Sequence, residues 1–221
     1  MKKVFIGVGH GGKDSGAVGK GGLLEKNLNL SIALACKDTL ERYGVKVLLS
    51  RVRDEHDPVG QEVQECNAFA PDLAVDIHNN AGGGDGAEIY YHHRGGEGKD
   101  LASNILNEIV KIGQNSRGIK TRVNSSGKDY YQFIRDTKAP AAIVECAFVD
   151  STDVSIVDTL HEQGQMGVAI AKGILKQLGV THESTRLYKV QTGAYTNRSN
   201  AEAEVKRLRA TGFNAIIIEE R

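Results

Sequence analysis

The sequence predicts an α/β fold over residues 1–179, with a largely parallel sheet covered by helices on both faces. Short apolar runs alternate with amphipathic stretches along this region, and three of the runs end at or near a titratable residue. The composition becomes polar after residue 180, which separates a short tail from the main domain. A chain of 221 residues is long enough for one main domain with a small appendage.

The candidate strands are short runs of apolar residues. They are Val4–Val8, Val45–Leu49, Leu73–Ile77, Ala87–Tyr91, Tyr130–Ile134 and Ala141–Val144. The candidate helices have apolar residues at intervals of three to five positions, as expected of an amphipathic helix. They are Leu24–Tyr43, Val59–Phe69, Leu101–Ile112 and Gln163–Leu178. Because strands and helices alternate, neighbouring strands are expected to be parallel.

The tail has a strand-helix-strand pattern of its own. We divide the chain into a catalytic domain (1–180), a polar linker (181–186) and a tail module (187–221). Within the tail, the pattern predicts two strands, Leu187–Thr192 and Phe213–Ile218, on either side of a helix at Asn197–Thr211. Segments below about 40 residues rarely fold alone, so we expect the tail to dock, most simply on a copy of itself.

The composition excludes several classes of partner. Lys plus Arg and Asp plus Glu number 28 each, so no charge excess indicates nucleic acid or a membrane surface. No apolar stretch approaches the roughly 20 residues of a membrane span. The first apolar run stops at Val8, short of the roughly 7–15 residues of a signal-peptide core, so we expect a protein made in the cytoplasm without a signal peptide. Three distant cysteines predict reduced thiols.

Four titratable residues form the candidate site. His10, His78 and Glu145 each lie within two residues of the end of a candidate strand, where open parallel sheets bind ligands. Glu25 lies three residues before Leu28, on the apolar face of a helix. A carboxylate facing the core is costly unless a positive group binds it. A metal ion would fill that role.

The residue types favour a zinc hydrolase. Two histidines and one glutamate with an open fourth position are a common catalytic zinc set, and we predict His10, Glu25 and His78 as the Zn²⁺ ligands. A second glutamate that does not bind the metal can act as general base for the attacking water, and we predict this role for Glu145. Each histidine taken singly could also be an ordinary loop residue, and the chain contains no HExxH or CxxC spacing.

Three single motifs allow other functions. The spacing from Gly7 to Gly12 matches a nucleotide-binding loop, but the acidic residue about 20 positions on should follow a second strand, whereas Glu25 begins a helix. Cys146 could be a nucleophile, although no local sequence favours a lowered thiol pKa. His92 and His93 at a strand end could line a cleft or belong to a solvated loop.

Several motifs together resemble one enzyme family. The pieces are Val8-Gly9-His10-Gly11-Gly12, Leu24-Glu25-Lys26-Asn27-Leu28, Ile77-His78-Asn79-Asn80 and Val144-Glu145-Cys146-Ala147-Phe148. In order and spacing, over about residues 3–179, the chain resembles the zinc N-acetylmuramoyl-L-alanine amidases of the Amidase_3 family. The resemblance implies a sheet of about six strands and hydrolysis of the amide bond between N-acetylmuramic acid and L-alanine in peptidoglycan. It also implies zinc at His10, Glu25 and His78, with Glu145 as the catalytic glutamate.

Substrate contacts are predicted at two further residues of the matching motifs. Arg135 suits bidentate recognition of a substrate carboxylate, and Asn80 ends the motif that contains His78. The chain departs from the family pattern at three positions. Val8 stands where the family usually has Pro, Asn79 stands where a small residue is common, and Glu62 stands near the place of a common Arg.

The tail resembles half of a SPOR domain, a module that binds peptidoglycan. The similar segments are Tyr188–Tyr195, Asn200–Glu202 and Gly212–Phe213. A full SPOR domain has two β-α-β halves, so the resemblance implies a homodimer in which two tails complete one module. The alternatives are a zinc peptidase or deacetylase acting on the wall, and a non-catalytic wall-binding protein. The setting would be a phage endolysin released through holin-type holes or an autolysin acting when a mother cell lyses.

Overall fold

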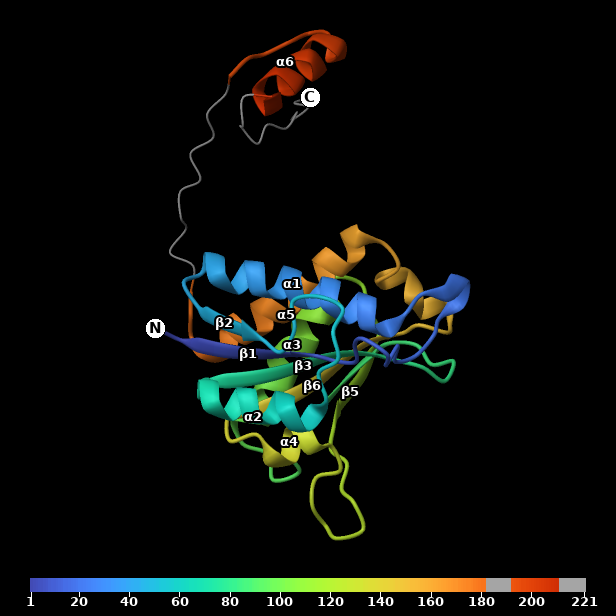
Figure 1. Ribbon diagram of the computed structural model, residues 1–221, viewed down its shortest axis with the longest axis vertical. Coiled ribbons are helices and arrows are strands. Elements are labelled where there is room, and N and C mark those ends of the chain that lie inside the picture. Colours follow the sequence, from blue (N-terminus) through green and yellow to red (C-terminus); the bar gives the residue numbers. More distant parts are fainter. Residues whose placement is uncertain (182–191, 211–221) are drawn as a thin grey trace. The chain divides into compact units, whose positions relative to one another are not determined.

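The computed structural model describes residues 1–181 and 192–210. The chain divides into two units, Met1–His182 and Glu183–Arg221. In the first unit a six-stranded sheet lies between two layers of helices (Figure 1).

The strands and helices of the first unit follow one another closely. The strands are β1 (Lys3–Val8), β2 (Lys46–Leu49), β3 (Leu73–Asn80), β4 (Ala87–Tyr91), β5 (Ser116–Lys120) and β6 (Ala141–Phe148). The α-helices are α1 (Glu25–Arg42), α2 (Val59–Phe69), α3 (Glu97–Lys111), α4 (Gln132–Asp136) and α5 (Leu160–Leu178). Two short 3-10 helices cover Lys20–Gly22 and Thr152–Ile156.

The sheet has the strand order β2-β1-β3-β6-β4-β5. Every neighbouring pair is parallel except β4 and β6, which are antiparallel. This confirms the largely parallel sheet of about six strands. The carboxyl ends of β1, β3 and β6 meet at one edge, and the register there places His78 of β3 beside Glu145 of β6. The candidate residues are thus brought to the edge where such sheets bind ligands.

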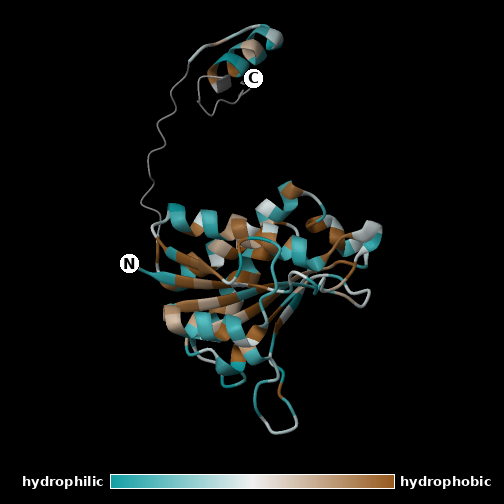
Figure 2. Ribbon diagram, in the orientation of Figure 1, coloured by the Kyte–Doolittle hydropathy of each residue, from teal (hydrophilic) through white to brown (hydrophobic). Residues whose placement is uncertain are grey.

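Helices cover both faces of the sheet, which explains why its central strands are apolar on both sides. Helices α1, α3 and α5 lie on one face, and α2 and α4 lie on the other (Figure 1). The larger core packs Ile6, Ile77 and Val144 of the sheet against α1, α3 and α5. The smaller core packs Phe5 against Val63 and Phe133. In Figure 2 the strands are mostly hydrophobic, whereas hydrophobic and hydrophilic residues alternate along the helices around them.

Two sequence predictions for this unit were wrong or incomplete. The strand predicted at Tyr130–Ile134 is instead the start of helix α4. Phe133 and Ile134 are both buried in the smaller core, whereas adjacent residues of a strand point to opposite faces. Strand β5 was not predicted, because it is a sheet edge with only one aliphatic residue, Ile119.

In the second unit the structure describes one helix, α6 (Arg198–Ala210), within the predicted range Asn197–Thr211. Ion pairs between Arg198 and Glu202 and between Arg207 and Glu204 lie along it. Most of the predicted linker and the predicted strand Phe213–Ile218 lie outside the described residues, as does Leu187–Thr192 except for its last residue. Over residues 1–181 and 192–210, no helix is long and apolar enough to cross a membrane.

Candidate active site

His10, Glu25 and His78 converge on one point at the carboxyl edge of the sheet. The distance from His10 Nε2 to Glu25 Oε2 is 3.2 Å, and that from His78 Nδ1 to Glu25 Oε1 is also 3.2 Å. One nitrogen or oxygen atom from each of the three residues lies within 4.8 Å of the others. The structure therefore brings together the three residues that the sequence predicted as ligands.

The backbone around these residues allows the close approach. His10 follows β1 with φ of 62°, a left-handed conformation that is uncommon for a residue with a side chain and is typical of functional sites. Gly9 and Gly16 leave room for the cluster. A Cβ at position 9 would lie 2.2 Å from the His78 ring, and one at position 16 would lie 2.5 Å from Glu25 Oε2.

Two aspartates contact the ring nitrogens of His10 and His78 that face away from Glu25, and so orient the rings. Asp14 Oδ2 lies 2.8 Å from His10 Nδ1, and Asp76 Oδ2 lies 3.1 Å from His78 Nε2. Carboxylates in this position commonly fix the tautomer of metal-binding histidines. Neither aspartate was predicted from the sequence to have a role. A charged residue inside the buried run Leu73–Ile77 was the signal that could have identified Asp76.

The hydrogen-bond arrangement requires a cation among the three inner groups. A neutral imidazole that donates outward to its aspartate presents a lone pair inward. The inward nitrogens of His10 and His78 each face an oxygen of Glu25 at 3.2 Å. Two lone-pair atoms at that distance repel each other unless a proton or a metal ion lies between them. The residues present therefore fit a divalent metal with His and carboxylate ligands.

The pKa shifts agree with a strongly negative site. Although burial opposes ionisation of Glu25, its hydrogen bonds to His10 and His78 lower the pKa of this carboxyl far below its usual value. The hydrogen bond with Glu25 raises the pKa of His10. Burial opposes the charge on His78, but Asp76 and Glu25 outweigh it and raise the pKa of this histidine. Glu25 thus stays ionised and favours positive charge at both histidines.

Glu145 lies beside the cluster without joining it. It pairs in register with His78 on the adjacent strand, about 4.8 Å away in the hydrogen-bonding direction, so both side chains leave the same face of the sheet. Burial raises the pKa of Glu145 to about 7. A carboxylate with a raised pKa next to a cation site has the properties of a general base.

Arg51 is a structural support of the site that sequence reasoning missed. Its side chain is buried, and its guanidinium donates to the carbonyl oxygens of Val8 at 3.0 Å, Gly9 at 3.2 Å and Lys26 at 2.7 Å. These bonds tie the loop that carries His10 to the helix that carries Glu25. Arg51 lies in a polar stretch after β2, and nothing in the local sequence distinguishes it from a surface residue.

The two predicted substrate contacts occupy different places. Asn80 ends β3 at the site's edge, and its side-chain amide donates to Glu88 Oε1 at 3.1 Å. Arg135 lies in α4, where its guanidinium donates to the carbonyl oxygens of Asp129 at 3.0 Å and Tyr130 at 3.2 Å. Arg135 thus holds a loop in place, and its contact with substrate stays a prediction.

The cysteines take no part in the chemistry. Cys36, Cys66 and Cys146 are buried free thiols, as the sequence predicted. Burial raises the pKa of the Cys146 thiol well above its usual value. Because the thiolate is the nucleophilic form, Cys146 is unsuited to nucleophilic catalysis.

A second histidine cluster lies at the opposite edge of the sheet. β4 runs antiparallel to β6, so His92 and His93, which follow β4, are carried away from Glu145. Asp129 Oδ2 lies 3.0 Å from His92 Nε2 and 2.7 Å from His93 Nδ1. The backbone N–H of Arg94 donates to His92 Nδ1, which leaves Nε2 to donate to Asp129. The cluster is therefore a hydrogen-bonded anchor for the loop around Asp129.

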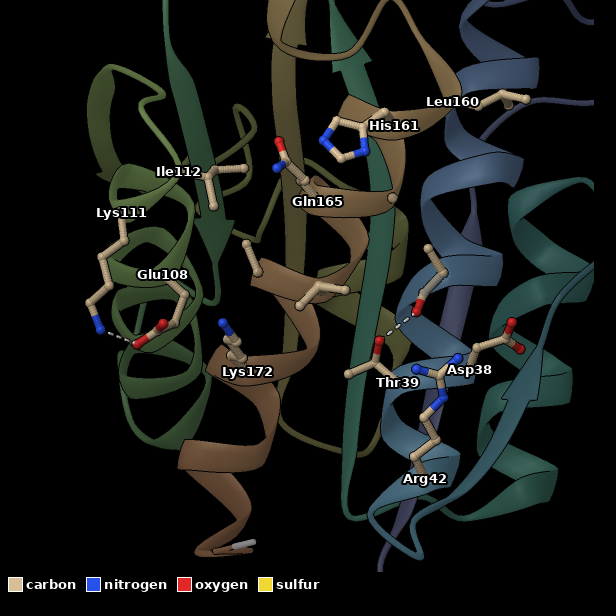
Figure 3. A pocket seen from close by; sticks show the side chains of 14 residues that line it. Asp38, Thr39, Arg42, Glu108, Lys111, Ile112, Leu160, His161, Gln165 and Lys172 are labelled. Atoms are coloured by element: carbon tan, nitrogen blue, oxygen red, sulfur yellow. Dashed lines mark hydrogen bonds and ion pairs between the residues drawn. The ribbon is translucent and has the colours of Figure 1, made fainter. Parts of the chain in front are cut away.

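The outer surface of the helices also carries a groove, of about 620 Å³, between α1, α3 and α5. Figure 3 shows Asp38 and Arg42 of α1 on one side, Glu108 and Lys111 of α3 on the other, and Lys172 of α5 between them. At 1.5 Å rise per residue, Asp38 lies about 20 Å along α1 from Glu25. The groove is thus separate from the candidate active site.

Comparisons with known proteins agree on one family. The N-acetylmuramoyl-L-alanine amidase family matches residues 4–176, and the SPOR domain family matches residues 173–221. The chain is 34% identical over 223 residues to the N-acetylmuramoyl-L-alanine amidase CwlM of Bacillus licheniformis, covering 99% of this chain and 85% of the relative. It is 34% identical over 224 residues to the sporulation-specific N-acetylmuramoyl-L-alanine amidase of Bacillus subtilis, with the same coverage of both chains.

A solved structure with a similar fold is Cwp6 from Clostridium difficile. It has a TM-score of 0.79 and 40% identity, and the match covers 80% of this chain and 29% of Cwp6. The sheet, with histidine and glutamate side chains at its carboxyl edge, is that of an amidase catalytic domain. The chain belongs to the N-acetylmuramoyl-L-alanine amidase family, and it is an enzyme that acts on peptidoglycan.

Proposed function

We propose that this amidase is zinc-dependent, with His10, Glu25 and His78 as the zinc ligands and Glu145 as the general base. The observation that carries the proposal is the pair of inward histidine nitrogens, each 3.2 Å from an oxygen of Glu25 and each backed by an aspartate. This donor set suits zinc. The bond cleaved is the amide between N-acetylmuramic acid and L-alanine.

The residues of the chain then have distinct tasks. Zinc, when bound, supplies a Lewis acid that polarises the scissile carbonyl and lowers the pKa of water. Glu145 accepts a proton from the attacking water and delivers it to the leaving nitrogen of L-alanine. Asp14 and Asp76 hold the two histidine rings in the required tautomers. Burial of Glu145 keeps its proton affinity high enough for both transfers.

Asn80 and Arg135 are proposed as substrate contacts. The position of Asn80 at the edge of the site, hydrogen-bonded to Glu88, supports this role. Arg135 also donates to the carbonyl oxygens of Asp129 and Tyr130, and its side chain stays 30% exposed, which leaves it open to substrate. The amidase family match over residues 4–176 favours the amidase over a zinc peptidase, a deacetylase or a non-catalytic wall-binding protein with the same four site residues.

The tail is proposed as a cell-wall-binding module. The SPOR match over residues 173–221 supports this. We propose a catalytic domain (1–180), a linker (181–186) and a tail (187–221), close to the division of the chain into units after His182. Because 35 residues are few for an independent fold, we propose that two tails pair in a homodimer. Sedimentation equilibrium of the intact chain should give twice the 23.8 kDa chain mass. A monomeric mass at micromolar concentration would contradict the pairing.

The proposed setting is an autolysin that acts on the wall when a mother cell lyses. The relatives that match across 99% of the chain include one named as sporulation-specific, which supports this setting over that of a phage endolysin. Expression timed to late sporulation would agree with it.

Metal analysis tests the zinc proposal. Purified protein should contain equimolar zinc, and a chelator should remove both the zinc and the activity, with added zinc restoring the activity. His78→Ala should lose most of the zinc, whereas His161→Ala, an exposed residue on α5, should keep it. Full activity in the metal-free protein, or equimolar zinc in His78→Ala, would refute the proposed ligand set.

A further inference from the structure

Glu88 is a buried carboxylate beside Glu145 that has no catalytic task in the proposed mechanism. It lies on β4 in register with Glu145 of β6, and its side chain is 6% exposed. Its Oε1 accepts from Asn80 at 3.1 Å and from the Tyr90 hydroxyl at 2.9 Å. Its Oε2 accepts from Arg117 and Lys120, so the acceptor sites of the carboxylate are occupied. Glu88 is therefore an anchor for other groups, not a second base.

Two cations from the edge strand share the other oxygen of Glu88. Arg117 Nε lies 2.7 Å from Glu88 Oε2, and Lys120 Nζ lies 2.5 Å from it. The Arg117 guanidinium also stacks over the Phe148 ring, 4.8 Å from its centroid. Two cations on one carboxylate leave a net charge of +1. This excess charge is held in a fixed place by a buried side chain.

The two cations remain available to a ligand. The Arg117 side chain is 38% exposed and that of Lys120 is 34% exposed. Among the described residues, Arg117 bonds Glu88 through Nε, and no hydrogen bond occupies its two terminal nitrogens. A guanidinium held by Nε and by an aromatic ring presents those terminal nitrogens as a ready pair of donors for a carboxylate.

We propose that Arg117 and Lys120 form a carboxylate-binding subsite for the stem peptide, on the leaving-amine side of the scissile bond. The subsite rests on the proposed amidase reaction and adds to it a preference for stem peptides with a free carboxylate. Its ligand is the free α-carboxylate of the γ-linked D-glutamate that follows L-alanine in the stem.

The spacing suits this carboxylate. One residue of extended chain spans at most about 3.6 Å, so a group on the second stem residue lies within roughly 7 Å of the scissile nitrogen. Glu88 lies one strand beyond Glu145, about 4.8 Å along the sheet, and the two cations lie just beyond Glu88. A stem that leaves Glu145 across β4 therefore places its second residue over Arg117 and Lys120.

The test compares one peptidoglycan in two forms, with the D-glutamate α-carboxylate free or enzymatically amidated. The intact protein should cut the free-carboxylate form roughly tenfold faster, the effect of losing one hydrogen bond between charged groups. Equal rates, or a faster rate on the amidated form, would overturn the subsite and leave the amidase reaction standing. Cleavage of neither form would overturn the amidase reaction and the subsite with it.

Variants assign the preference to these residues. Arg117→Gln and Lys120→Gln should each slow cleavage of the free-carboxylate form several-fold and leave the amidated form within about twofold of the wild-type rate. A structural defect would instead lower both rates together, and a variant that kept the tenfold ratio would exclude its residue. Lys111→Gln, an exposed lysine on α3, is the matched control and should keep the wild-type ratio.

Discussion

At the scale of single residues, Glu145 is the group whose removal should stop the reaction without emptying the metal site. Glu145→Gln keeps the size of the side chain and removes its ability to accept a proton. General acid-base groups contribute roughly 10²–10⁴-fold, so kcat should fall by that factor. Zinc content should stay equimolar, because the converging ligand atoms belong to His10, Glu25 and His78. Near-normal turnover by the variant would rule out Glu145 as the base.

Glu145 also predicts how activity depends on pH. Burial raises its pKa from 4.5 to about 7, and a zinc ion held by its neighbours would lower it again. The base works when deprotonated, so activity is present above this pKa and is lost as the pH falls through it. We expect the acidic limb of kcat/KM between about pH 4.5 and 7. A profile flat down to pH 4 would be incompatible with this role.

Asp76 should control zinc affinity through His78. Asp76→Asn removes the carboxylate that lies 3.1 Å from His78 Nε2, and loss of such a partner typically weakens metal binding about 10–100-fold. Competition with a chelator of known affinity measures the change. Asp38→Asn, an exposed carboxylate on α1, is the matched control. Equal zinc affinity in the two variants would show that Asp76 does not support the site.

The sequence identified the central residues of the site but not their supports. His10, His78 and Glu145 could be found because strand ends are visible in the sequence, and Glu25 because its helix face is. Asp14 and Asp76 lie four and two residues from their histidines, but only the folded chain shows which ring nitrogen each one faces. Arg51 acts through partners that lie far along the chain. Arg51, for instance, contacts Gly9, which lies 42 positions away. Sequence periodicity carries no information on such contacts.

At the scale of elements, α5 packs closely against α1 through Gly167. A Cβ at this position would lie 2.5 Å from the Ile32 carbonyl oxygen and 2.8 Å from the Cys36 nitrogen. Gly167→Ala should therefore destabilise the protein by roughly 1–3 kcal/mol, as overpacking does.

Gly164, one turn earlier in α5, is the matched control. Nothing lies within 4 Å of a Cβ built there, so Gly164→Ala should stabilise the helix by up to about 1 kcal/mol. Urea unfolding followed by circular dichroism measures both variants. Changes of the same sign and size would contradict the close packing at Gly167.

Long, strongly patterned elements could be predicted, and short ones at the margin could not. The buried strands β1, β3 and β6 and helices α1 and α5 have clear apolar patterns. β5 is recognisable as a strand only through its pairing with β4, and α4 is a five-residue helix whose start follows Tyr130 and Tyr131, so the segment resembles a strand. In both cases, tertiary contacts override weak local preference.

At the scale of the whole molecule, the two units should separate catalysis from wall binding. A chain ending at residue 181 contains the complete His10-Glu25-His78 cluster and Glu145. It should cleave soluble muramoyl-peptides at close to the full rate and sediment less with insoluble peptidoglycan than the intact protein does. Equal sedimentation of the two proteins would place wall binding in the first unit.

The most direct test of the zinc amidase mechanism is mass spectrometry of the fragments that the protein releases from peptidoglycan. We predict free stem peptides that begin with L-alanine, with the glycan strands uncut, and we predict that these peptides disappear on chelation and return with zinc. Stem peptides still attached to muramic acid, with cuts elsewhere, would contradict the assigned bond. Unchanged release after the metal is removed would contradict the assigned role of His10, Glu25 and His78.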